Sequence, residues 1–465
     1  MTVDEKTSDI FQKLDMVLEG YYPQMERDLL GLLAIPTVQG AAEENAPFGR
    51  PLVEALEYSL ALAKSLGLSV MNVDNYVGIA DLPGESEHQI GVLAHLDVVP
   101  GDPKDWMTGP FEPVIKDGRI YARGTEDDKG PFIASLYAMA ALADCGVSLS
   151  RTVRLLMGCN EESGMECMKY YLTKYPQPEM GFSPDGDFPL IIGEKGMAHY
   201  DIVATWPDED ELAAFKLVSF DSGTVANVVP AYAEAVLIAK TGSPALPEQP
   251  GISVKAEGDK LIVSAIGVAA HAAMPYEGDN ALVKLINYLS GLDLAPMGAK
   301  KFVKSLAELL RDSCFGEGMG IAGEDELSRL TSIPSILRVH DNAARLTMDM
   351  RFLLTKNTQY YYDKLTALVA EHGLEMENWD GHEPLYISED HPLVKELLSV
   401  YRDFTGDMRA PQIIGGGTYA KVMKNFVAFG PGNPGIAHQA DEYLSCEDLL
   451  KLAKIYARAI YGLAK

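Results

Sequence analysis

Apolar residues in the first third of the chain alternate between helical spacing and short continuous runs. Positions 52–66 carry apolar residues three and four apart, and Gly67 follows them, which indicates a helix and its end. Similar patterns predict a helix at 131–145, strands at 89–94 and 152–158, and a strand–turn–strand at 115–122 that turns at Asp117-Gly118. This alternation predicts an α/β domain whose mixed, largely parallel sheet is flanked by helices.

The pattern changes near Gly193 and changes back after Trp379. The intervening segment predicts strands within 196–271, helices at 280–292 and 301–311, a hairpin at 336–352 turning at Asp341-Asn342, a helix at 359–372 and a strand at 375–379. Helices at 394–405 and 446–463 then resume the first pattern. We therefore predict a discontinuous catalytic domain, 1–192 with 380–465, and an inserted α+β lid domain, 193–379.

Length and charge narrow the function classes. A chain of 465 residues is too long for one hydrophobic core, in agreement with two domains. With 39 Lys and Arg against 67 Asp and Glu, the net charge is −28, which would repel phosphates and argues against nucleic acid as a partner. The acidity is also what a soluble surface requires, and we prefer that interpretation.

The sequence predicts a cytoplasmic protein without a membrane partner. The first residues show no basic segment followed by an apolar one, so no secretory signal is expected. The most apolar stretch, 131–143, falls short of the roughly 20 residues that span a bilayer, and we interpret it as a buried helix. Five scattered cysteines without a CxxC pair indicate reduced thiols.

Candidate chemistry begins directly after the strand at 89–94, with His95 and Asp97. Residues two apart on an extended chain point the same way, and ligand sites form beyond the carboxyl ends of strands in α/β sheets. Asp97 could orient a metal-binding His95 by accepting from its second ring nitrogen. Taken alone, the same residues also fit an ordinary polar loop.

A second candidate is the acidic run Glu126-Asp127-Asp128, which has glycines on both sides and precedes an apolar helix. Three consecutive acids cannot all be buried without counter-charges. A solvated helix N-terminus is the simpler interpretation, because its dipole favours acids. The flanking glycines and the apolar helix fit a buried cation better.

Glu161 and Glu162 follow the strand at 152–158, and two further candidates come later: Asp185 in SPDG, a weak motif by itself, and His438 after a loop rich in glycine and proline. Adjacent glutamates point different ways, so one can bind metal while the other handles a proton. Two imidazoles and several carboxylates without thiolates suit zinc, manganese or cobalt. A shared carboxylate can hold two such ions about 3.5–4 Å apart.

The motifs HLDVVP, GRIYARGTEDDKG, NEES, SPD and AHQADEY occur in an order that resembles the zinc-dependent aminoacylase/carboxypeptidase/dipeptidase superfamily. The similarity covers the whole chain and is greatest to the dipeptidase PepV branch, which includes carnosinase-like enzymes. It implies two divalent metal ions per chain, with zinc expected and manganese or cobalt as alternatives. It implies a hydrolase that cleaves the amide bond of dipeptides, with β-alanyl dipeptides such as carnosine among the candidates.

The resemblance also implies individual roles. His95 and Asp185 match the ligands of one metal, and Glu162 and His438 match those of the other. Asp127 matches the bridging carboxylate, because the family pattern G-x-x-D-x-K-G selects it over Asp128. Asp97 matches the residue that orients the first histidine. Glu161 matches the general base that activates a metal-bridging water.

In the predicted lid, three residues match substrate contacts: His271 for the oxyanion, Asn227 as a polar contact and Arg351 for the substrate carboxylate. The turn Gly415-Gly416-Gly417 matches a backbone donor nest for that carboxylate. Without the family, His271 would be read as structural, Asn227 as a turn residue and Arg351 as a solvent-facing strand residue.

Related activities remain open. An acylamino-acid deacylase or a succinyl-diaminopimelate desuccinylase would use the same metal ligands, although the aspartate at 185 favours the aminopeptidase-like side. Gln439 stands where the branch has a small residue, which bears on substrate preference. A non-catalytic metal-stabilised binding protein would have lost the base or a ligand, and all are present in the sequence. Dimeric members of the family that the chain resembles have a shorter insertion, so the resemblance implies here a lid that covers its own chain, hence a monomer.

Overall fold

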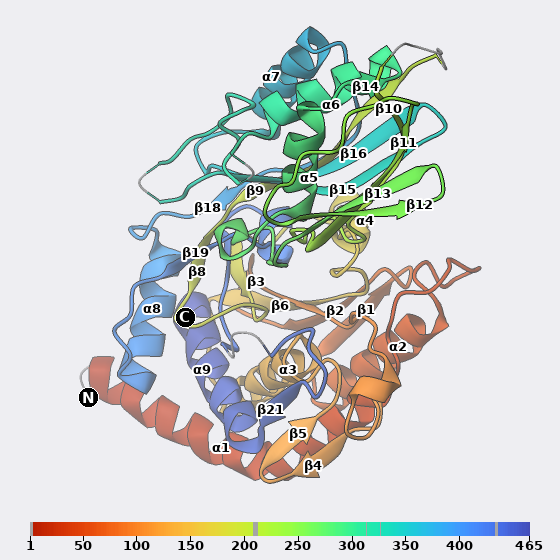
Figure 1. The fold of residues 1–465 in the computed structure, drawn as a ribbon. Helices are drawn as coiled ribbons and strands as arrows, with labels where there is room; N and C mark the ends of the chain where they lie inside the picture. Colours follow the sequence, from red (N-terminus) through yellow and green to blue (C-terminus); the bar gives the residue numbers. More distant parts are fainter. Residues whose placement is uncertain (1–2, 208–212, 313, 326, 433–435) are drawn as a thin grey trace. The chain divides into compact units, whose positions relative to one another are not determined.

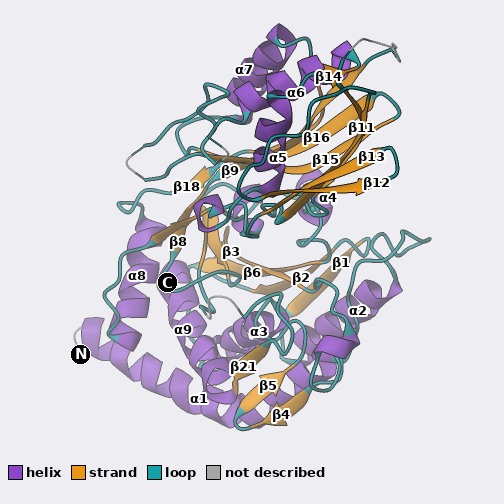
Figure 2. Ribbon diagram, viewed as in Figure 1, coloured by secondary structure: helices purple, strands orange, loops and turns teal. Residues whose placement is uncertain are grey.

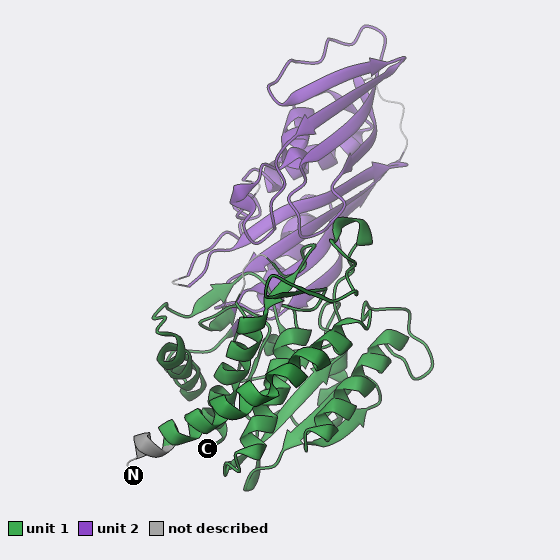
Figure 3. Ribbon diagram, turned by 90° about the horizontal axis from the view of Figure 1, so that it is seen from below, with its two compact units in different colours: residues 1–193, 386–465 green, residues 194–385 purple. Residues whose placement is uncertain are grey.

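The computed structural model describes residues 3–207, 213–312, 314–325, 327–432 and 436–465. The chain forms two compact units: unit 1 comprises Met1–Gly193 and Tyr386–Lys465, and unit 2 comprises Glu194–Leu385 (Figure 3). The first junction lies one residue from the predicted boundary and the second lies six residues later. Unit 2 is therefore an insertion in the chain of unit 1.

A nine-stranded mixed sheet forms the centre of unit 1 (Figure 1). Its strand order is β1 (Ser69–Val73), β2 (Val77–Leu82), β6 (Arg151–Gly158), β3 (Ser86–His95), β7 (Met180–Ser183), β20 (Phe426–Ala428), β8 (Ile191–Glu194) and β18 (Leu385–Tyr386), with β19 (Gln412–Ile414) pairing with β8. The pairs β6–β3, β3–β7 and β7–β20 are parallel, whereas β1–β2, β2–β6 and β20–β8 are antiparallel. The predicted mixed sheet is confirmed, and its parallel part is central.

Helices and a small second sheet complete unit 1 (Figure 2). The helices are α1 (Val3–Leu33), α2 (Arg50–Ser65), α3 (Lys129–Asp144), α4 (Glu166–Lys174), α8 (Pro392–Thr405) and α9 (Cys446–Ala464). The small sheet joins β21 (Tyr443–Ser445), β5 (Arg119–Tyr121) and β4 (Val114–Lys116), and β4 and β5 turn at the predicted Asp117-Gly118. Helices α1 and α4 were not predicted from the sequence.

Helix α3 explains the most apolar stretch of the sequence. Its residues from Lys129 to Leu142 are all buried, because α1, α9 and strands β3 and β6 surround it. A helix that is apolar on every side is expected only in such a position. Among the described residues, no helix combines the length and apolarity needed to cross a membrane. All five cysteines lie in the described ranges and are free of disulfide bonds.

Unit 2 is an α+β unit, as predicted. Its nine-stranded sheet runs β12 (Ile252–Glu257), β13 (Lys260–Ile266), β11 (Tyr232–Ala239), β10 (Phe215–Ser222), β15 (Thr331–His340), β16 (Ala343–Phe352), β9 (Gly196–Thr205) and β17 (Glu375–His382), with β14 (Leu294–Ala295) parallel to β10. Helices α5 (Ala281–Ser290), α6 (Met297–Leu309) and α7 (Thr358–Glu371) complete it. Asp341 and Asn342 both have positive φ between β15 and β16, so the predicted hairpin turn is confirmed.

Candidate metal centre

Three parallel strands bring the predicted ligands to one edge of the unit 1 sheet. His95 is the last residue of β3 and pairs in register with Gly158, the last residue of β6. Glu161 follows β6 by three residues, and Asp185 follows β7 by two. Because parallel neighbours end at the same edge, side chains that are distant in sequence meet there.

The carboxylate of Asp127 lies between the two histidines. Its Oδ1 is 2.8 Å from His95 Nε2, and its Oδ2 is 2.8 Å from His438 Nε2. His438 Nε2 is also 3.1 Å from Glu162 Oε1. One oxygen toward each imidazole is the arrangement that a carboxylate needs to bind two neighbouring cations at once. The peptide bond between Asp127 and Asp128 is cis.

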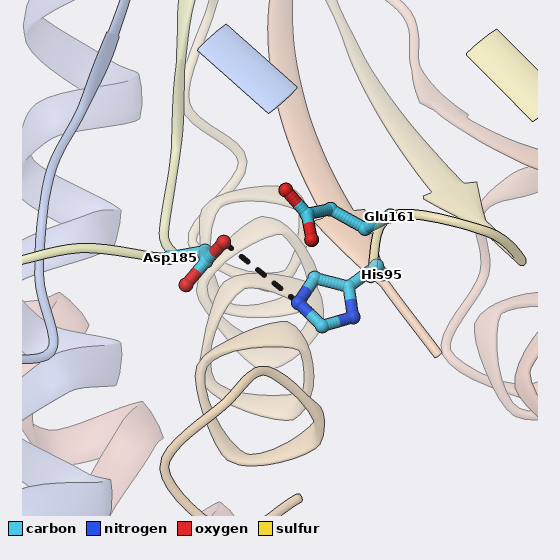
Figure 4. A group of neighbouring side chains, drawn as sticks. All are labelled: His95, Glu161 and Asp185. Carbon is cyan, nitrogen blue, oxygen red and sulfur yellow. Dashed lines mark ion pairs between the residues drawn. The ribbon is translucent and has the colours of Figure 1, made fainter. Parts of the chain in front are cut away.

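The potential ligands form two groups that share this region. His95, Glu161 and Asp185 form one group, and Figure 4 shows them converging from three segments, with Asp185 Oδ2 3.8 Å from His95 Nε2. Asp127, Glu162 and His438 form the other, and within each group the ligand atoms lie within 4.8 Å of one another. The structure thus brings together all five predicted ligands and the predicted base, Glu161.

Asp97 contacts His95 through a different atom from the one that sequence reasoning favoured. His95 Nδ1 lies 2.8 Å from the carbonyl oxygen of Asp97, whereas the carboxylate Oδ1 is 3.6 Å away. The carboxylate instead accepts hydrogen bonds from the backbone N–H groups of Glu161 and Glu162, both at 3.0 Å. Asp97 therefore fixes the histidine tautomer with its backbone and the two glutamates with its side chain.

The donor set fits divalent cations. His95 Nε2 and Asp127 Oδ1 lie 2.8 Å apart without forming a hydrogen bond, and Glu161 Oε1 is likewise buried with no hydrogen bond to any described residue. Buried polar atoms without hydrogen-bond partners are costly and rare, and a cation bound between them would satisfy all three. Imidazole nitrogens and carboxylate oxygens without thiolates are suitable ligands for zinc and for similar borderline ions.

The electrostatics of the cluster also favour a cation. Burial raises the pKa of Asp185 to about 8, with Asp127 and Glu162 adding to the shift, and burial raises the pKa of Asp97 to about 6. Burial likewise raises the pKa of Glu161 well above its ordinary value. Hydrogen bonds to Asp127 and Glu162 raise the pKa of His438 to about 11. Added positive charge would relieve the repulsion among the acids.

Sequence reasoning missed several residues around these ligands. Glu442 is buried and contacts the Asp127 loop through Oε1, which accepts from Gly124 N and Glu126 N, while Arg123 donates to its Oε2. Tyr419 is buried edge-on against the ring of His95. Glu442 lies four residues after His438, but neither periodicity nor spacing distinguishes it from a surface acid.

Two predicted substrate contacts meet in unit 2. Val228 and His271 form an isolated antiparallel bridge, and Ala272 N donates to the carbonyl oxygen of Asn227 at 2.9 Å. Ala273 N donates to His271 Nδ1 at 3.2 Å, so the free proton of a neutral ring belongs on Nε2. His271 is exposed, and burial of part of its ring together with the charge of Arg351 lowers its pKa.

Arg351 belongs to the same part of unit 2. It pairs in register with Thr331, whose Oγ1 donates to Ala272 O at 3.2 Å. Its guanidinium is buried against Asp349, with Nε 2.9 Å from Oδ1 and Nη2 2.8 Å from Oδ2. His199 Nε2 lies 2.8 Å from the same Oδ2. The alternative of a solvent-facing strand arginine is therefore wrong.

The Gly415-Gly416-Gly417 turn belongs to unit 1, between β19 and the short 3-10 helix at Tyr419–Val422. Lys421 Nζ donates to Gly416 O at 3.3 Å, and Thr418 caps the 3-10 helix by accepting from Ala420 N. The contact of the Gly415-Gly416-Gly417 turn with a substrate carboxylate stays a prediction.

A mixed α/β unit with a two-group acid and histidine centre, together with an inserted α+β unit, is the architecture of a metal-dependent hydrolase. The family model described as Peptidase family M20/M25/M40 matches residues 91–462, and the chain belongs to this family. The "Putative dipeptidase YtjP" of Bacillus subtilis (strain 168) is 36% identical over 457 residues, covering 94% of this chain and 97% of the relative. A "Putative dipeptidase" of Staphylococcus epidermidis is 35% identical, covering 97% and 98%.

Solved structures share the fold at low sequence identity. Human carnosine dipeptidase 1 aligns with a TM-score of 0.56 at 14% identity, covering 97% of this chain and 99% of that one. The aminoacylhistidine dipeptidase of Vibrio alginolyticus aligns with a TM-score of 0.59 at 14% identity, covering 95% and 96%. The Bacillus subtilis YXEP protein, described as a dinuclear metal binding peptidase, aligns at 0.52 and 11%, covering 96% and 98%.

Proposed function

We propose that this enzyme is a dipeptidase that works with two divalent metal ions held by the predicted ligands. The observation that carries the proposal is the position of Asp127, with one carboxylate oxygen 2.8 Å from each histidine. His95 and Asp185 would complete one metal site, and Glu162 and His438 the other. Zinc is the expected ion, and manganese or cobalt are the alternatives.

The metal ions would supply Lewis-acid charge and would acidify a water molecule. Side chains of the protein carry out the remaining steps. Glu161 accepts the proton of the attacking water. The same residue then returns the proton to the leaving amine as the carbon–nitrogen bond breaks. The predicted role of His271 as hydrogen-bond donor to the oxyanion, through Nε2–H, belongs to the same proposal.

Two observations support dipeptides as the substrate class. Relatives covering nearly the whole chain carry dipeptidase names, and the family resemblance gives Arg351 the role of binding the substrate carboxylate. Asp349 fixes the plane of the Arg351 guanidinium through two parallel contacts, and a planar fork matches a carboxylate better than a point charge does. Carnosine-like β-alanyl dipeptides belong to the class to be tested. Cytoplasmic location and a monomeric state stay predictions.

The proposal is tested by a substrate screen with controlled metal content. We expect hydrolysis of dipeptides, slower hydrolysis of tripeptides and N-acyl amino acids, and loss of all activity after chelation. Adding back zinc, manganese or cobalt should restore activity, and amino-acid release measures the rate. Dipeptide hydrolysis that survives complete metal removal would contradict the proposal, and preference for N-acyl amino acids would reassign the substrate class.

Arg351→Lys should raise KM for dipeptides by at least about tenfold with a smaller change in kcat, because a point charge cannot reproduce a two-pronged contact. A dipeptide amide lacks the carboxylate, so the variant and the unchanged enzyme should hydrolyse it at the same low rate. Arg345→Lys is a matched control, since this arginine pairs with Asp201 and Glu377 at part-exposed positions. Equal rates of the unchanged enzyme on a dipeptide and its amide would contradict the carboxylate contact.

A further inference from the structure

Glu442 connects two loops that lie more than 300 positions apart in the sequence. Its Oε1 accepts from the backbone N–H groups of Gly124, Glu126 and Asp127 at 3.0, 2.9 and 3.3 Å. Three N–H groups around one oxygen form a cradle of the kind that binds anions. Here the anion is a side chain of the protein itself, and it holds the backbone of the loop that presents Asp127.

Arg123 closes the connection from the other side. Its Nη1 donates to Glu442 Oε2 at 2.5 Å, and its Nη2 donates to the carbonyl oxygen of His438 at 3.2 Å. The two side chains are 3% and 0% exposed, so solvent does not screen the pair. A buried charge pair is costly unless further hydrogen bonds satisfy its polar groups; these contacts satisfy the Glu442 carboxylate, whereas Arg123 Nε has no hydrogen-bond partner among the described residues.

The His438 loop needs such support. His438 has φ 65 and Asp441 has φ 56, in the left-handed region that non-glycine residues rarely adopt. Residues keep such costly backbone conformations where several separate contacts hold them in place. Here the carbonyl of His438 is bound by Arg123, Asp441 Oδ1 accepts from Met107 N at 2.7 Å, and Glu442 O accepts from Ala122 N.

We propose that Glu442, acting with Arg123, is a positioning residue that sets the distance between Asp127 and His438. This inference rests on the proposed dinuclear function, in which Asp127 and His438 are ligands of the same metal ion. Neither Glu442 nor Arg123 binds metal in the proposal. Removing the connection should therefore weaken metal binding while leaving all five ligands in the chain.

The test is Glu442→Gln, which keeps size and one carbonyl oxygen but loses the ion pair with Arg123. Zinc release from the full-length metal-loaded enzyme to excess chromogenic chelator should show one ion per chain leaving about 10–100-fold faster, the range for loss of outer-shell partners. The absorption spectrum of the cobalt-substituted variant should change as well. The other ion, beside His95 and Asp185, should be less affected.

Asp81→Asn is the matched control. It breaks a less deeply buried charge pair elsewhere in unit 1, where Arg154 Nε and Nη2 lie 2.9 and 2.8 Å from Asp81. This variant should lose thermal stability but release zinc like the unchanged enzyme. If Glu442→Gln does not fold, Arg123→Lys replaces it and should show a smaller increase in release rate.

Three results separate the hypotheses. Unchanged release kinetics and an unchanged cobalt spectrum in a folded Glu442→Gln would overturn the positioning role. So would a loss of thermal stability alone, as in the control. An unchanged enzyme that binds fewer than two ions would instead contradict the proposed dinuclear function.

Discussion

Replacing Glu161 by glutamine should lower kcat by about 10²–10⁴-fold while both metal ions stay bound, because general-base catalysis contributes that much to the rate. Glutamine has the same shape but cannot accept the proton of the attacking water. Substrate binding should change little, so KM should stay within a small factor. Steady-state kinetics and elemental analysis of the same preparation measure both quantities.

Glu166→Gln is the matched control for Glu161→Gln, since Glu166 is an exposed glutamate at the start of α4 that pairs with Lys169. It should keep full activity. The role of base has to be distinguished from that of a metal ligand, because Glu161 lies in a group of potential ligands with His95 and Asp185. Loss of one ion from Glu161→Gln would identify Glu161 as a ligand, and near-normal turnover would exclude it as the base.

Replacing Asp127 by asparagine should abolish activity and weaken both metal sites together. One carboxylate oxygen points to each histidine, and asparagine keeps only one neutral oxygen, so the substitution removes a ligand from one ion and the negative charge that both ions share. We expect zinc affinity to fall at both positions by more than the roughly 10–100-fold that outer-shell changes cause. Equilibrium competition with a chelating dye measures the two affinities, and circular dichroism checks that the variant is folded.

Asp128→Asn is the informative comparison. Asp128 is fully buried, and its Oδ2 accepts from the backbone N–H of His95 at 3.0 Å, so it supports β3 rather than facing both histidines. Its substitution should reduce zinc affinity less than Asp127→Asn does. Two intact sites in Asp127→Asn, together with two weakened sites in Asp128→Asn, would transfer the bridging role to Asp128.

Much of the fold could be predicted because its signals are local. The helix at 131–145 and the Asp341-Asn342 turn appear in the sequence as apolar spacing and turn residues, and both are present in the structure. Helix α1 was missed because its 31 residues mix charged and apolar positions and include Pro23, so its apolar face is visible only where it packs on α3 and α9.

The residues of the candidate site likewise divide into those that local sequence signals predict and those that only the structure identifies. His95 and Glu161 were predictable because they lie just after apolar strands that the sequence predicts, whereas Asp185 was selected by the family resemblance. Glu442 and Asp349 were not predictable, because a buried charge is recognised only by its partners, and these come from distant segments or a neighbouring position on a strand. The role of the Asp97 carbonyl was likewise invisible, since sequence reasoning weighs side chains and not the backbone oxygen beside them.

The most direct test of the central claim is a crystal structure of the zinc-loaded enzyme with data collected at the zinc absorption edge. The proposal predicts two anomalous peaks per chain about 3.5–4 Å apart, with the Asp127 carboxylate between them. His95 and Asp185 should coordinate one peak, and Glu162 and His438 the other. A single peak, or two peaks of which only one contacts Asp127, would contradict the bridged dinuclear centre.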